Sequence, residues 1–552
     1  MTDPTDSMQM RRAELQLLRT LPELLTHHLE HRPQIPVYMQ YDNRVKQWQT
    51  LTVQDTYERV MRWAHAFAAL GLKRGERVAM LLPNGIDAIC FDMAALMCAL
   101  VPVPLHAIDT AGSSAFILRD SGARFLVTTK FNRWRDIGAA MDLPDLQTVV
   151  ITDEGIETTV ADGRTVTSVD HWLATGQDAE LPPGPEPTDL AALVYTSGTT
   201  GKPKGVMLTD NNFNGIAMQF SACDTLFSKG QSLLNIMPPF IAYGFACGVH
   251  LPLTLGIKVV IIPNLDSNKL GSLIWKYKPE HMFGVPSHYQ QLAVDPKLQN
   301  KDLSFIRNYA AGGDAIARGA EQTVNDFLAA HNVEFPIAKG YGMTEASSAA
   351  TAAAGRNNKP GSVGLPLVST LVSAFEPGTD TELPIGQRGE LCISGPGVMK
   401  GYYNKPAETA AILRTHADGR VWVHTGDIGY LDEDGFVYLD SRIKRLIIRH
   451  DGFKVFPSMI ENVVSQHPAV HQCSVVGCAD KDHVQGRLPF VYIVLKADTT
   501  AKKKQVIREL ERMCTEELPE YVQPVAYKFI PEMPMTPVGT VSYTHLTLPT
   551  IA

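Results

Sequence analysis

Residues 195–205 read Tyr195-Thr196-Ser197-Gly198-Thr199-Thr200-Gly201-Lys202-Pro203-Lys204-Gly205. An apolar run over 190–194 precedes this stretch and another over 206–208 follows it, so the pattern predicts a strand, a loop and a second strand. Glycines let a loop turn its backbone N–H groups inward around an anion, and hydroxyl and ammonium groups add donors. The stretch has no acidic residue and lacks the Gly-Lys-Ser/Thr ending of a Walker A loop. We therefore expect it to hold a polyphosphate; the alternative is a flexible Gly/Thr-rich surface hairpin.

The composition is that of a soluble protein with a sizeable core. The chain has 552 residues, 45% hydrophobic and 20% charged, which is enough for two to four domains. A net charge of −8 argues against general binding to nucleic acid or to anionic membranes. The one basic run, Lys502-Lys503-Lys504, is short and is expected to be a solvated helix start.

Three features favour a cytoplasmic protein with no transmembrane segment. The eight cysteines are scattered and include no Cys-x-x-Cys pair, as expected for reduced thiols in the cytosol. The first turns of the N-terminus are charged and have no apolar signal-peptide core. The most apolar tract, 88–105, contains Asp92 and ends in Val101-Pro102-Val103-Pro104, which predicts a buried helix running into a strand.

Alternating elements predict an α/β fold. We expect helices over 51–70, 88–100 and 113–121 and strands over 77–82, 101–105 and 125–128. This order is typical of parallel sheets with flanking helices on both faces. A proline-rich connector over 181–187 leads to the opening stretch, and a strand over 258–263 resumes the α/β pattern. From 365 to 438 short strands with frequent Gly and Pro, including 389–393, predict a β-rich subdomain.

A domain boundary is expected at 440–442. Beyond it the sequence predicts strands over 446–448, 474–476 and 490–495 and helices over 457–466 and 503–517. These elements make a small α+β unit of domain size. We therefore expect a large N-terminal domain over 1–440 and a C-terminal domain over 441–540.

Two motifs identify a family. The opening stretch resembles the phosphate loop of the adenylate-forming (AMP-binding) superfamily, which includes acyl-CoA synthetases, luciferases and nonribosomal adenylation domains. Gly340-Tyr341-Gly342-Met343-Thr344-Glu345 is similar to that family's second core motif. The resemblance implies that Thr344 contacts the phosphates, that Glu345 holds Mg²⁺ and that Tyr341 stacks on adenine. An aromatic face between glycines, a hydroxyl and a carboxylate also suit ATP·Mg on chemical grounds.

Further motifs follow in the family's order. Ala311-Gly312-Gly313-Asp314 resembles its adenine-contacting turn, although alone it is only a loop. His424-Thr425-Gly426-Asp427 resembles the motif whose Asp, here Asp427, accepts hydrogen bonds from the ribose hydroxyls. Arg442 matches the arginine that joins it at the ribose and phosphate. The alternative for Asp427 and Arg442 is a simple surface ion pair.

The C-terminal domain carries the remaining motifs. Lys444 falls at the family's hinge position, about which this domain rotates between two half-reactions. Asp451-Gly452-Phe453 resembles the segment brought to the active site for thioester formation, where Gly452 leaves a narrow passage for pantetheine.

The resemblance thus implies ATP, Mg²⁺ and coenzyme A as cofactors and gives three sets of site residues. The catalytic set is Lys202, Lys204, Thr344, Glu345 and Lys444. The metal set is Thr196 and Glu345. The cofactor-binding set is Thr196, Ser197, Gly198, Thr199, Thr200, Gly201, Gly313, Asp314, Tyr341, Gly342, Asp427, Arg442, Gly452 and Phe453.

The sequence departs from the family near its end. Thr540 stands where the family has a lysine that bridges the substrate carboxylate and the phosphate. Losing one such donor typically costs ~10²–10³ in rate, so we expect weak adenylation and largely retained thioester formation from supplied acyl-adenylate. The residues from Val541 to Leu546 resemble a translated end of a transposon-type sequencing adapter. We hypothesise that the genuine chain ends at about Gly539 and that 541–552 are a non-native tail.

A second departure concerns the acid substrate. Ile241 stands where relatives often have a histidine near the substrate carboxylate. Phe240, Ile241, Tyr243 and Phe245 favour an apolar acyl pocket, or they are ordinary core residues.

Together these features predict an ATP-dependent acid:CoA ligase. Its predicted substrate is a small-molecule carboxylic acid with an apolar chain, namely a fatty acid. Two alternatives remain: an acyl-AMP ligase that loads a carrier-protein thiol, and a nucleotide-binding regulator without catalysis. The intact Lys202, Glu345, Asp427 and Arg442 speak against the regulator. The sequence does not predict an oligomeric state.

Overall fold

Strands β9 (Leu190–Thr196) and β10 (Lys204–Thr209) form the hairpin predicted around the opening stretch. They pair antiparallel, with Thr196 opposite Lys204. Strand β20 (Gly401–Tyr402) joins on the other side of β10, where Tyr402 lies opposite Val206. The hairpin therefore carries the loop at one end and is fixed along its side by a segment about two hundred residues away.

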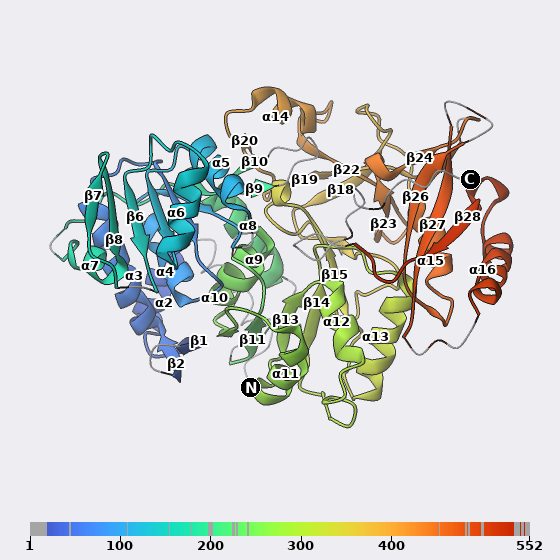
Figure 1. Ribbon diagram of the computed structural model, residues 1–552, viewed down its shortest axis with the longest axis horizontal. Coiled ribbons are helices and arrows are strands. Elements are labelled where there is room, and N and C mark those ends of the chain that lie inside the picture. Colours follow the sequence, from blue (N-terminus) through green and yellow to red (C-terminus); the bar gives the residue numbers. More distant parts are fainter. Residues whose placement is uncertain are drawn as a thin grey trace.

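The computed structural model describes most of the chain (Figure 1). The described residues are 19–42, 46–107, 109–153, 155–177, 179–196, 203–222, 227, 230–239, 242–451, 453–480, 483, 486–497, 499, 502–534, 541 and 546.

The largest sheet has nine strands in the order β17-β16-β15-β14-β13-β11-β12-β1-β2. Its central strands pair in parallel, and β2, β16 and β17 pair antiparallel at its two sides. The strands are β1 (Pro36–Asp42), β2 (Gln47–Thr52), β11 (Ser232–Asn235), β12 (Lys258–Ile261), β13 (His281–Gly284), β14 (Asn308–Ala311), β15 (Ala338–Tyr341), β16 (Thr351–Ala353) and β17 (Leu365–Pro366).

A second sheet has six strands in the order β4-β3-β5-β6-β8-β7, all parallel except β7. It lies at one end of the molecule, drawn in blue to cyan in Figure 1. The strands are β3 (Arg77–Leu81), β4 (Val101–Pro104), β5 (Phe125–Thr128), β6 (Thr148–Ile151), β7 (Thr159–Ala161) and β8 (Arg164–Ser168). The predicted α/β alternation over 77–128 is confirmed, because β3, β4 and β5 and the helices between them lie where the sequence places them.

The helices of this part cover the sheets. They are α2 (Leu21–His31), α3 (Val53–Ala69), α4 (Ile86–Met97), α5 (Ala111–Ser121), α6 (Phe131–Ala140), α7 (Val169–Ala174), α8 (Asp210–Ala222), α9 (Ala242–Phe245), α10 (Leu251–Leu255), α11 (Leu270–Tyr277), α12 (Pro286–Ala293) and α13 (Arg318–Ala330). A π-helical turn over Ala246–His250 joins α9 to α10, and 3₁₀ turns lie at Ser267–Lys269 and Thr344–Ala346.

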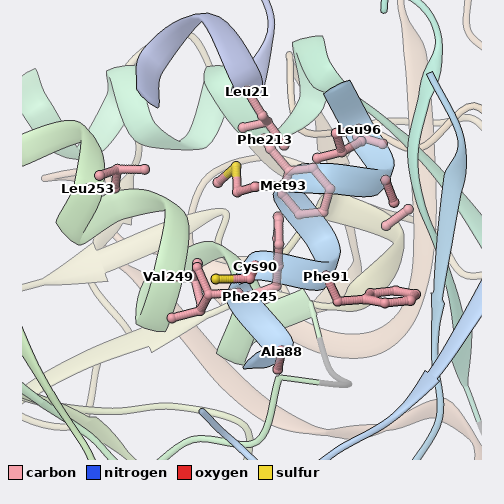
Figure 2. Packing of buried hydrophobic residues seen from close by; sticks show 14 of the residues in the cluster. Leu21, Ala88, Cys90, Phe91, Met93, Leu96, Phe213, Phe245, Val249 and Leu253 are labelled. Atoms are coloured by element: carbon pink, nitrogen blue, oxygen red, sulfur yellow. The ribbon is translucent and has the colours of Figure 1, made fainter. Parts of the chain in front are cut away.

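Helix α4 is the centre of the main core (Figure 2). Side chains of α4, including Cys90 and Met93, lie among Leu21 of α2, Phe213 of α8 and Phe245 of α9. Even Asp92 is buried, and that burial raises the pKa of its carboxyl well above the ordinary value. Surrounding helices therefore account for the apolar character of the tract 88–105, and no helix of the described residues has the length and apolarity to cross a bilayer.

A β-rich part and a C-terminal α+β unit complete the chain. The β-rich part contains β18 (Leu371–Phe375), β19 (Gly389–Ser394), β21 (Leu413–Thr415), β22 (Val421–Leu431), β23 (Val437–Arg442) and helix α14 (Pro406–Ile412). The C-terminal unit, orange to red in Figure 1, contains β24 (Ile447–Ile448), β25 (Lys454–Val455), α15 (Pro457–Val464), β26 (Val470–Ala479), β27 (Arg487–Leu495), α16 (Lys503–Glu517) and β28 (Ala526–Phe529), with 3₁₀ turns at Ile443–Arg445 and Glu520–Val522.

The predicted domain boundary falls inside β23. Ser441 and Arg442 still pair with Ile428 and Asp427 of β22, so the first residues of the predicted C-terminal domain complete a sheet of the larger part. The division at 440/441 stays a prediction.

A buried carboxyl joins α8 to α2. The backbone N–H of Leu21 donates to Oδ1 of Asp210 at 2.6 Å, and the Asp210 side chain is fully buried. Burial raises the pKa of Asp210 to about 7. The folded protein therefore keeps this proton up to about pH 7, whereas the unfolded chain loses it near pH 4.

We expect the stability of the protein to fall between pH 5 and pH 7 because of this group. Folding opposes ionisation of Asp210, and one pKa unit corresponds to about 1.4 kcal/mol, so the free energy of unfolding should drop by about 2 kcal/mol more in the wild type than in Asp210→Asn. Urea denaturation at the two pH values measures the difference. Asp266→Asn, which changes an exposed carboxyl of lowered pKa, should leave the profile of the wild type unchanged. Parallel profiles for wild type and Asp210→Asn would contradict the assignment.

Candidate active site

A cavity of about 1820 Å³ opens beside the β9–β10 hairpin, the end of β15 and the β22–β23 pair. These elements come from distant parts of the chain, and the predicted site residues lie at their ends. Those that line the cavity are Thr196, Lys204, Gly313, Tyr341, Gly342, Thr344, Glu345 and Arg442.

Some predicted residues lie outside the described residues. They are Ser197, Gly198, Thr199, Thr200, Gly201, Lys202 and Gly452, together with Phe240, Ile241 and Thr540. For Lys444 the structure describes the backbone, in the 3₁₀ turn Ile443–Arg445, but not the side chain.

Tyr341, Asp427 and Arg442 form a hydrogen-bonded chain. The hydroxyl of Tyr341 donates to Oδ2 of Asp427 at 2.8 Å, and Nε of Arg442 lies 3.0 Å from Oδ1. The arginine side chain is 61% exposed, whereas the aspartate side chain is only 10% exposed. Burial raises the pKa of Asp427 above its ordinary value, although Arg442 and Tyr341 oppose this. The pair is therefore not confined to the surface. Asp427 is not among the lining residues, but its buried carboxylate is held by two residues that are, Tyr341 and Arg442, with one of them on each oxygen.

The Asp427 turn is stabilised by Glu390, which also lines the cavity. The backbone N–H of Gly426 donates to Oε1 of Glu390 at 3.0 Å, and Nδ1 of His424 lies 3.0 Å from Oε2. Burial raises the pKa of Glu390, but these two hydrogen bonds, together with the electrostatic effects of His424 and Arg414, hold the pKa below the ordinary value. Glu390 is therefore an ionised anchor for the Thr425–Asp427 segment.

Glu345 lies beside two residues of the hairpin sheet. The hydroxyl of Tyr402 donates to Oε1 of Glu345 at 2.6 Å, and the ammonium of Lys204 lies 5.1 Å from the centre of the Tyr402 ring. Burial raises the pKa of Tyr402, so its phenol keeps the proton that it donates. Sequence reasoning missed Tyr402, because its link to Glu345 depends on the pairing of β20 with β10.

The Glu345 carboxylate suits a hard divalent cation. Among the described residues, Tyr402 is its one side-chain hydrogen-bond partner, and it contacts Oε1 only. The other oxygen of Glu345, Oε2, and the hydroxyl of Thr196 at the end of β9 are oxygen ligands that the same cavity offers to a metal ion. Mg²⁺ prefers one or two carboxylates together with substrate phosphates and water, so the donor set fits this ion.

The turn after Tyr341 is tightly constrained. A Cβ on Gly342 would lie 1.8 Å from the carbonyl oxygen of Ser348. Ser347 and Ser348 have φ values of 59° and 126°, and the Ser347 hydroxyl donates to the Gly397 carbonyl at 2.6 Å. Such backbone conformations persist where the surroundings enforce them, and here they fix Thr344 and Glu345 at the cavity.

Only part of the predicted adenine-contacting turn, 311–314, lines the cavity. Gly313 lines it and has φ +78°, a conformation that favours glycine. Asp314 is not among the lining residues; its Oδ1 accepts a hydrogen bond from the N–H of Ala315 at 2.8 Å.

Part of the cavity lining is an apolar wall. Tyr243 lies on this wall, and its ring would be 3.2 Å from a Cβ on Gly312, so that glycine lets the ring pack closely. Phe245 instead belongs to the main core, against Phe213 (Figure 2). The apolar wall consists of Phe220, Ile236, Met237, Tyr243, Leu265, Phe283 and Val285.

Phe453 lies on the C-terminal unit and is not among the lining residues. Its side chain is 51% exposed, and its ring stacks on Tyr521 with centroids 4.6 Å apart.

Comparisons with known proteins agree with this geometry. Residues 25–403 match the AMP-binding enzyme family, and residues 459–540 match the AMP-binding enzyme C-terminal domain. A long-chain-fatty-acid–CoA ligase of Bacillus subtilis is 30% identical over 95% of this chain and 93% of its own length. A probable 4-coumarate–CoA ligase of Dictyostelium discoideum is 28% identical (89% and 88%), and a fatty acid–[acyl-carrier-protein] ligase of Streptomyces coeruleorubidus is 29% identical (95% and 95%).

Solved structures share the fold over nearly the whole chain. The o-succinylbenzoate coenzyme A synthetase of Bacillus subtilis, in complex with ATP and magnesium ion, is 25% identical with a TM-score of 0.77 and covers 95% of this chain and 98% of its own. An ATP-bound RpMatB-BxBclM chimera is 26% identical with a TM-score of 0.82 and covers 96% and 98%. The chain therefore belongs to the AMP-binding enzyme family, in the branch of AMP-forming acid:CoA ligases.

Proposed function

We propose that this protein converts a fatty acid into its CoA thioester in two steps, with ATP consumed to AMP and pyrophosphate. One observation carries the proposal: the same cavity is lined by Tyr341 and Arg442, which are the two partners of Asp427, by Glu345 and by an apolar wall. The first two suit a nucleotide and its metal, and the third suits an acyl chain.

In the first step the acid carboxylate attacks the α-phosphate of ATP, and pyrophosphate leaves. Two unit charges ~4 Å apart repel by ~1 kcal/mol in water and by ~4 kcal/mol at an effective dielectric of about 20, so the site must supply positive charge. Lys204 lies at the cavity, and Lys202 of the glycine-rich loop is proposed to join it. Glu345 and Thr196 would hold the Mg²⁺ that accompanies ATP and neutralises its phosphates.

The nucleoside part of ATP is proposed to lie along the hydrogen-bonded chain. Asp427 would accept from the ribose hydroxyls, and Arg442, whose guanidinium is mostly exposed, remains available to the phosphate. The Tyr341 hydroxyl donates to Asp427, and its ring would stack on adenine next to Gly313 and Gly342, which line the same cavity. Thr344 would contact the phosphates beside Glu345.

In the second step the CoA thiol attacks the acyl carbonyl and AMP leaves. We propose that residues 441–540 rotate about Lys444 and bring Gly452 and Phe453 to the cavity. The Phe453 ring is exposed, and its one described ring contact is with Tyr521 of the same unit. This supports the proposal, because the segment could move to the cavity without breaking ring contacts to the larger part.

The apolar wall supports a hydrophobic acid. Its aromatic and aliphatic side chains offer no charged partner to a second carboxylate, so a monocarboxylic acid is favoured. The relatives named as long-chain-fatty-acid–CoA ligases from Bacillus subtilis and Escherichia coli support a fatty acid, and the 4-coumarate–CoA ligase relative supports an aromatic acid as the alternative that the acid panel below tests. The carrier-protein ligase among the relatives favours one alternative acceptor, a carrier-protein thiol.

A panel of fatty and aromatic acids tests the proposal. Pyrophosphate release and CoA consumption are measured together, in the protein as it is and in Thr540→Lys. We expect both signals with fatty acids, and a rise of about 10²-fold in pyrophosphate release on Thr540→Lys, because the lysine supplies a cation to the charged first step.

Each other outcome has a meaning. Pyrophosphate release without CoA consumption would indicate that the acyl group is transferred to a carrier-protein thiol and not to CoA. Neither signal with any acid, in either protein, would favour a nucleotide-binding regulator. Equal pyrophosphate release with and without Thr540→Lys would contradict the role assigned to that position.

A further inference from the structure

A cluster of ligand-type side chains lies next to the Thr425–Asp427 turn. One of them, His424, also lines the cavity, but none has a part in the proposed reaction. Asp380 comes from the turn after β18, His416 follows β21, and His424 lies in β22. The backbone hydrogen bonds of the 416–420 turn fix His416 at the end of the β21–β22 hairpin. We propose that Asp380, His416 and His424 form a binding site for one Zn²⁺ ion.

The three ligand atoms have the separations of a zinc site. Nε2 of His416 and Nε2 of His424 are 3.0 Å apart, and Oδ1 of Asp380 lies 3.5 Å and 3.7 Å from them. A circle through three atoms at these separations has a radius of about 2.0 Å, which equals the usual zinc–nitrogen and zinc–oxygen bond lengths of about 2.0–2.2 Å. The two nitrogens face each other, so the imidazoles need only tilt toward Asp380 to share an ion on that side.

Glu390 sets the tautomer that metal binding requires. Its carboxylate can only accept hydrogen bonds, so Nδ1 of His424, 3.0 Å away, carries the proton. In the neutral ring Nε2 is then left with its lone pair, which faces His416. A carboxylate behind a ligating histidine is the usual outer partner of zinc-bound imidazoles.

The surroundings also favour a bound cation. Both histidines are buried, and their Nε2 atoms lie against each other and within 4 Å of Oδ1 of Asp380, so a cation can be shared among the three atoms. The Asp380 side chain is 50% exposed and gives the ion a route from solvent. Arg414 lies 3.4 Å from the same oxygen of Asp380, so its guanidinium competes with a metal ion for that carboxylate. Two imidazoles and one carboxylate, with a water in the fourth position, select Zn²⁺ over Mg²⁺.

A second histidine cluster, His450, Asp480 and His483, provides the control. Its two rings stack in parallel with centroids 3.4 Å apart and planes within 3°. The in-plane lone pairs of parallel rings run side by side and do not converge on one ion, so hydrogen bonding to Asp480 explains this cluster without a metal.

Zinc binding to the full-length protein tests the site, and its readout does not depend on activity. The protein is made without a polyhistidine tag, stripped with a chelator, placed in excess Mg²⁺ without nucleotide, and titrated with Zn²⁺ against a chromogenic chelator. Co²⁺ replaces Zn²⁺ in a parallel titration, because a four-coordinate site gives intense visible absorption. We expect one equivalent of either ion in the wild type and in His483→Gln, and none in His416→Gln.

Two further variants keep the test decisive if His416→Gln does not fold. Asp380→Asn changes a half-exposed residue and should also lose the equivalent, and Glu390→Gln should weaken Zn²⁺ binding about 10–100-fold. The proposal is overturned if the stripped wild type binds no equivalent, if Asp380→Asn binds it as tightly as the wild type, or if His483→Gln removes it. The first of these outcomes would leave His416 and His424 as a hydrogen-bonded pair of imidazoles.

Discussion

Replacement of Glu345 by glutamine should lower the rate of adenylate formation by about 10³-fold or more. The variant keeps the shape of the side chain and an oxygen that accepts from Tyr402, so the turn over 342–348 should stay in place. What it loses is the negative charge proposed to hold Mg²⁺ against the phosphates of ATP. Removing one preorganised electrostatic group costs ~10²–10³ in rate, and here the metal's position is lost as well.

The two half-reactions separate this effect from general damage. Pyrophosphate release at several Mg²⁺ concentrations should fall and should require more Mg²⁺, whereas thioester formation from supplied acyl-adenylate should change little, because pyrophosphate and its metal have already left. Both rates are compared with those of a parent carrying Thr540→Lys, whose higher starting rate leaves room for the fall.

Tyr402→Phe is the matched control for Glu345→Gln. It removes the hydroxyl 2.6 Å from Oε1 and leaves the ring against Lys204, so adenylation should fall by only about tenfold. An unchanged Mg²⁺ dependence and full pyrophosphate release in Glu345→Gln would refute the metal role and leave Glu345 as a hydrogen-bond acceptor for Tyr402.

Much of the fold could be predicted because its signals are local. The strand–loop–strand pattern over 190–208 gave the β9–β10 hairpin, and the helix expected over 503–517 has those bounds. The prediction of a buried helix and a strand for the apolar tract 88–105 is confirmed, because Asp92 and the two prolines disfavour a bilayer span and these local signals are in the sequence.

The apolar wall of the cavity could not be predicted from local sequence patterns. Tyr243 and Phe245 are two aromatic residues separated by one position, yet Tyr243 lines the cavity and Phe245 lies in the core. Side chains two positions apart on a helix point in nearly opposite directions. Because 242–245 is helical, Tyr243 and Phe245 cannot both point into the same pocket. The sequence alone did not predict that short helix.

The partners of the site residues could not be predicted, because sheet pairing across long stretches of chain brings them together. Tyr402 reaches Glu345 through β20 and β10, and Glu390 reaches Gly426 through β19 and β22. Motif resemblance named the residues at the cavity, but the side chains that orient them have no signal near those motifs in the sequence.

Gly342→Ala should abolish nucleotide binding and lower the free energy of unfolding by at least ~3 kcal/mol. The added Cβ would lie 1.8 Å from the Ser348 oxygen and 2.7 Å from Cα of Ala349, both backbone atoms that cannot rotate away. Overpacking in a tight interior typically costs 1–3 kcal/mol, and a contact with backbone lies at or above the upper end of that range. The turn must therefore move, and Thr344 and Glu345 move with it.

Urea denaturation and calorimetric titration with ATP·Mg measure the two losses of Gly342→Ala. Gly112→Ala is the control: it adds the same methyl group in helix α5, where nothing lies within 4 Å, and should be neutral or slightly stabilising. A stable Gly342→Ala protein that no longer binds ATP would show that the turn can move without unfolding its surroundings, and would still support its place in the nucleotide site. Binding at the wild-type level would contradict that place, because a backbone that yields to the methyl group cannot be what holds Thr344 and Glu345 at the cavity.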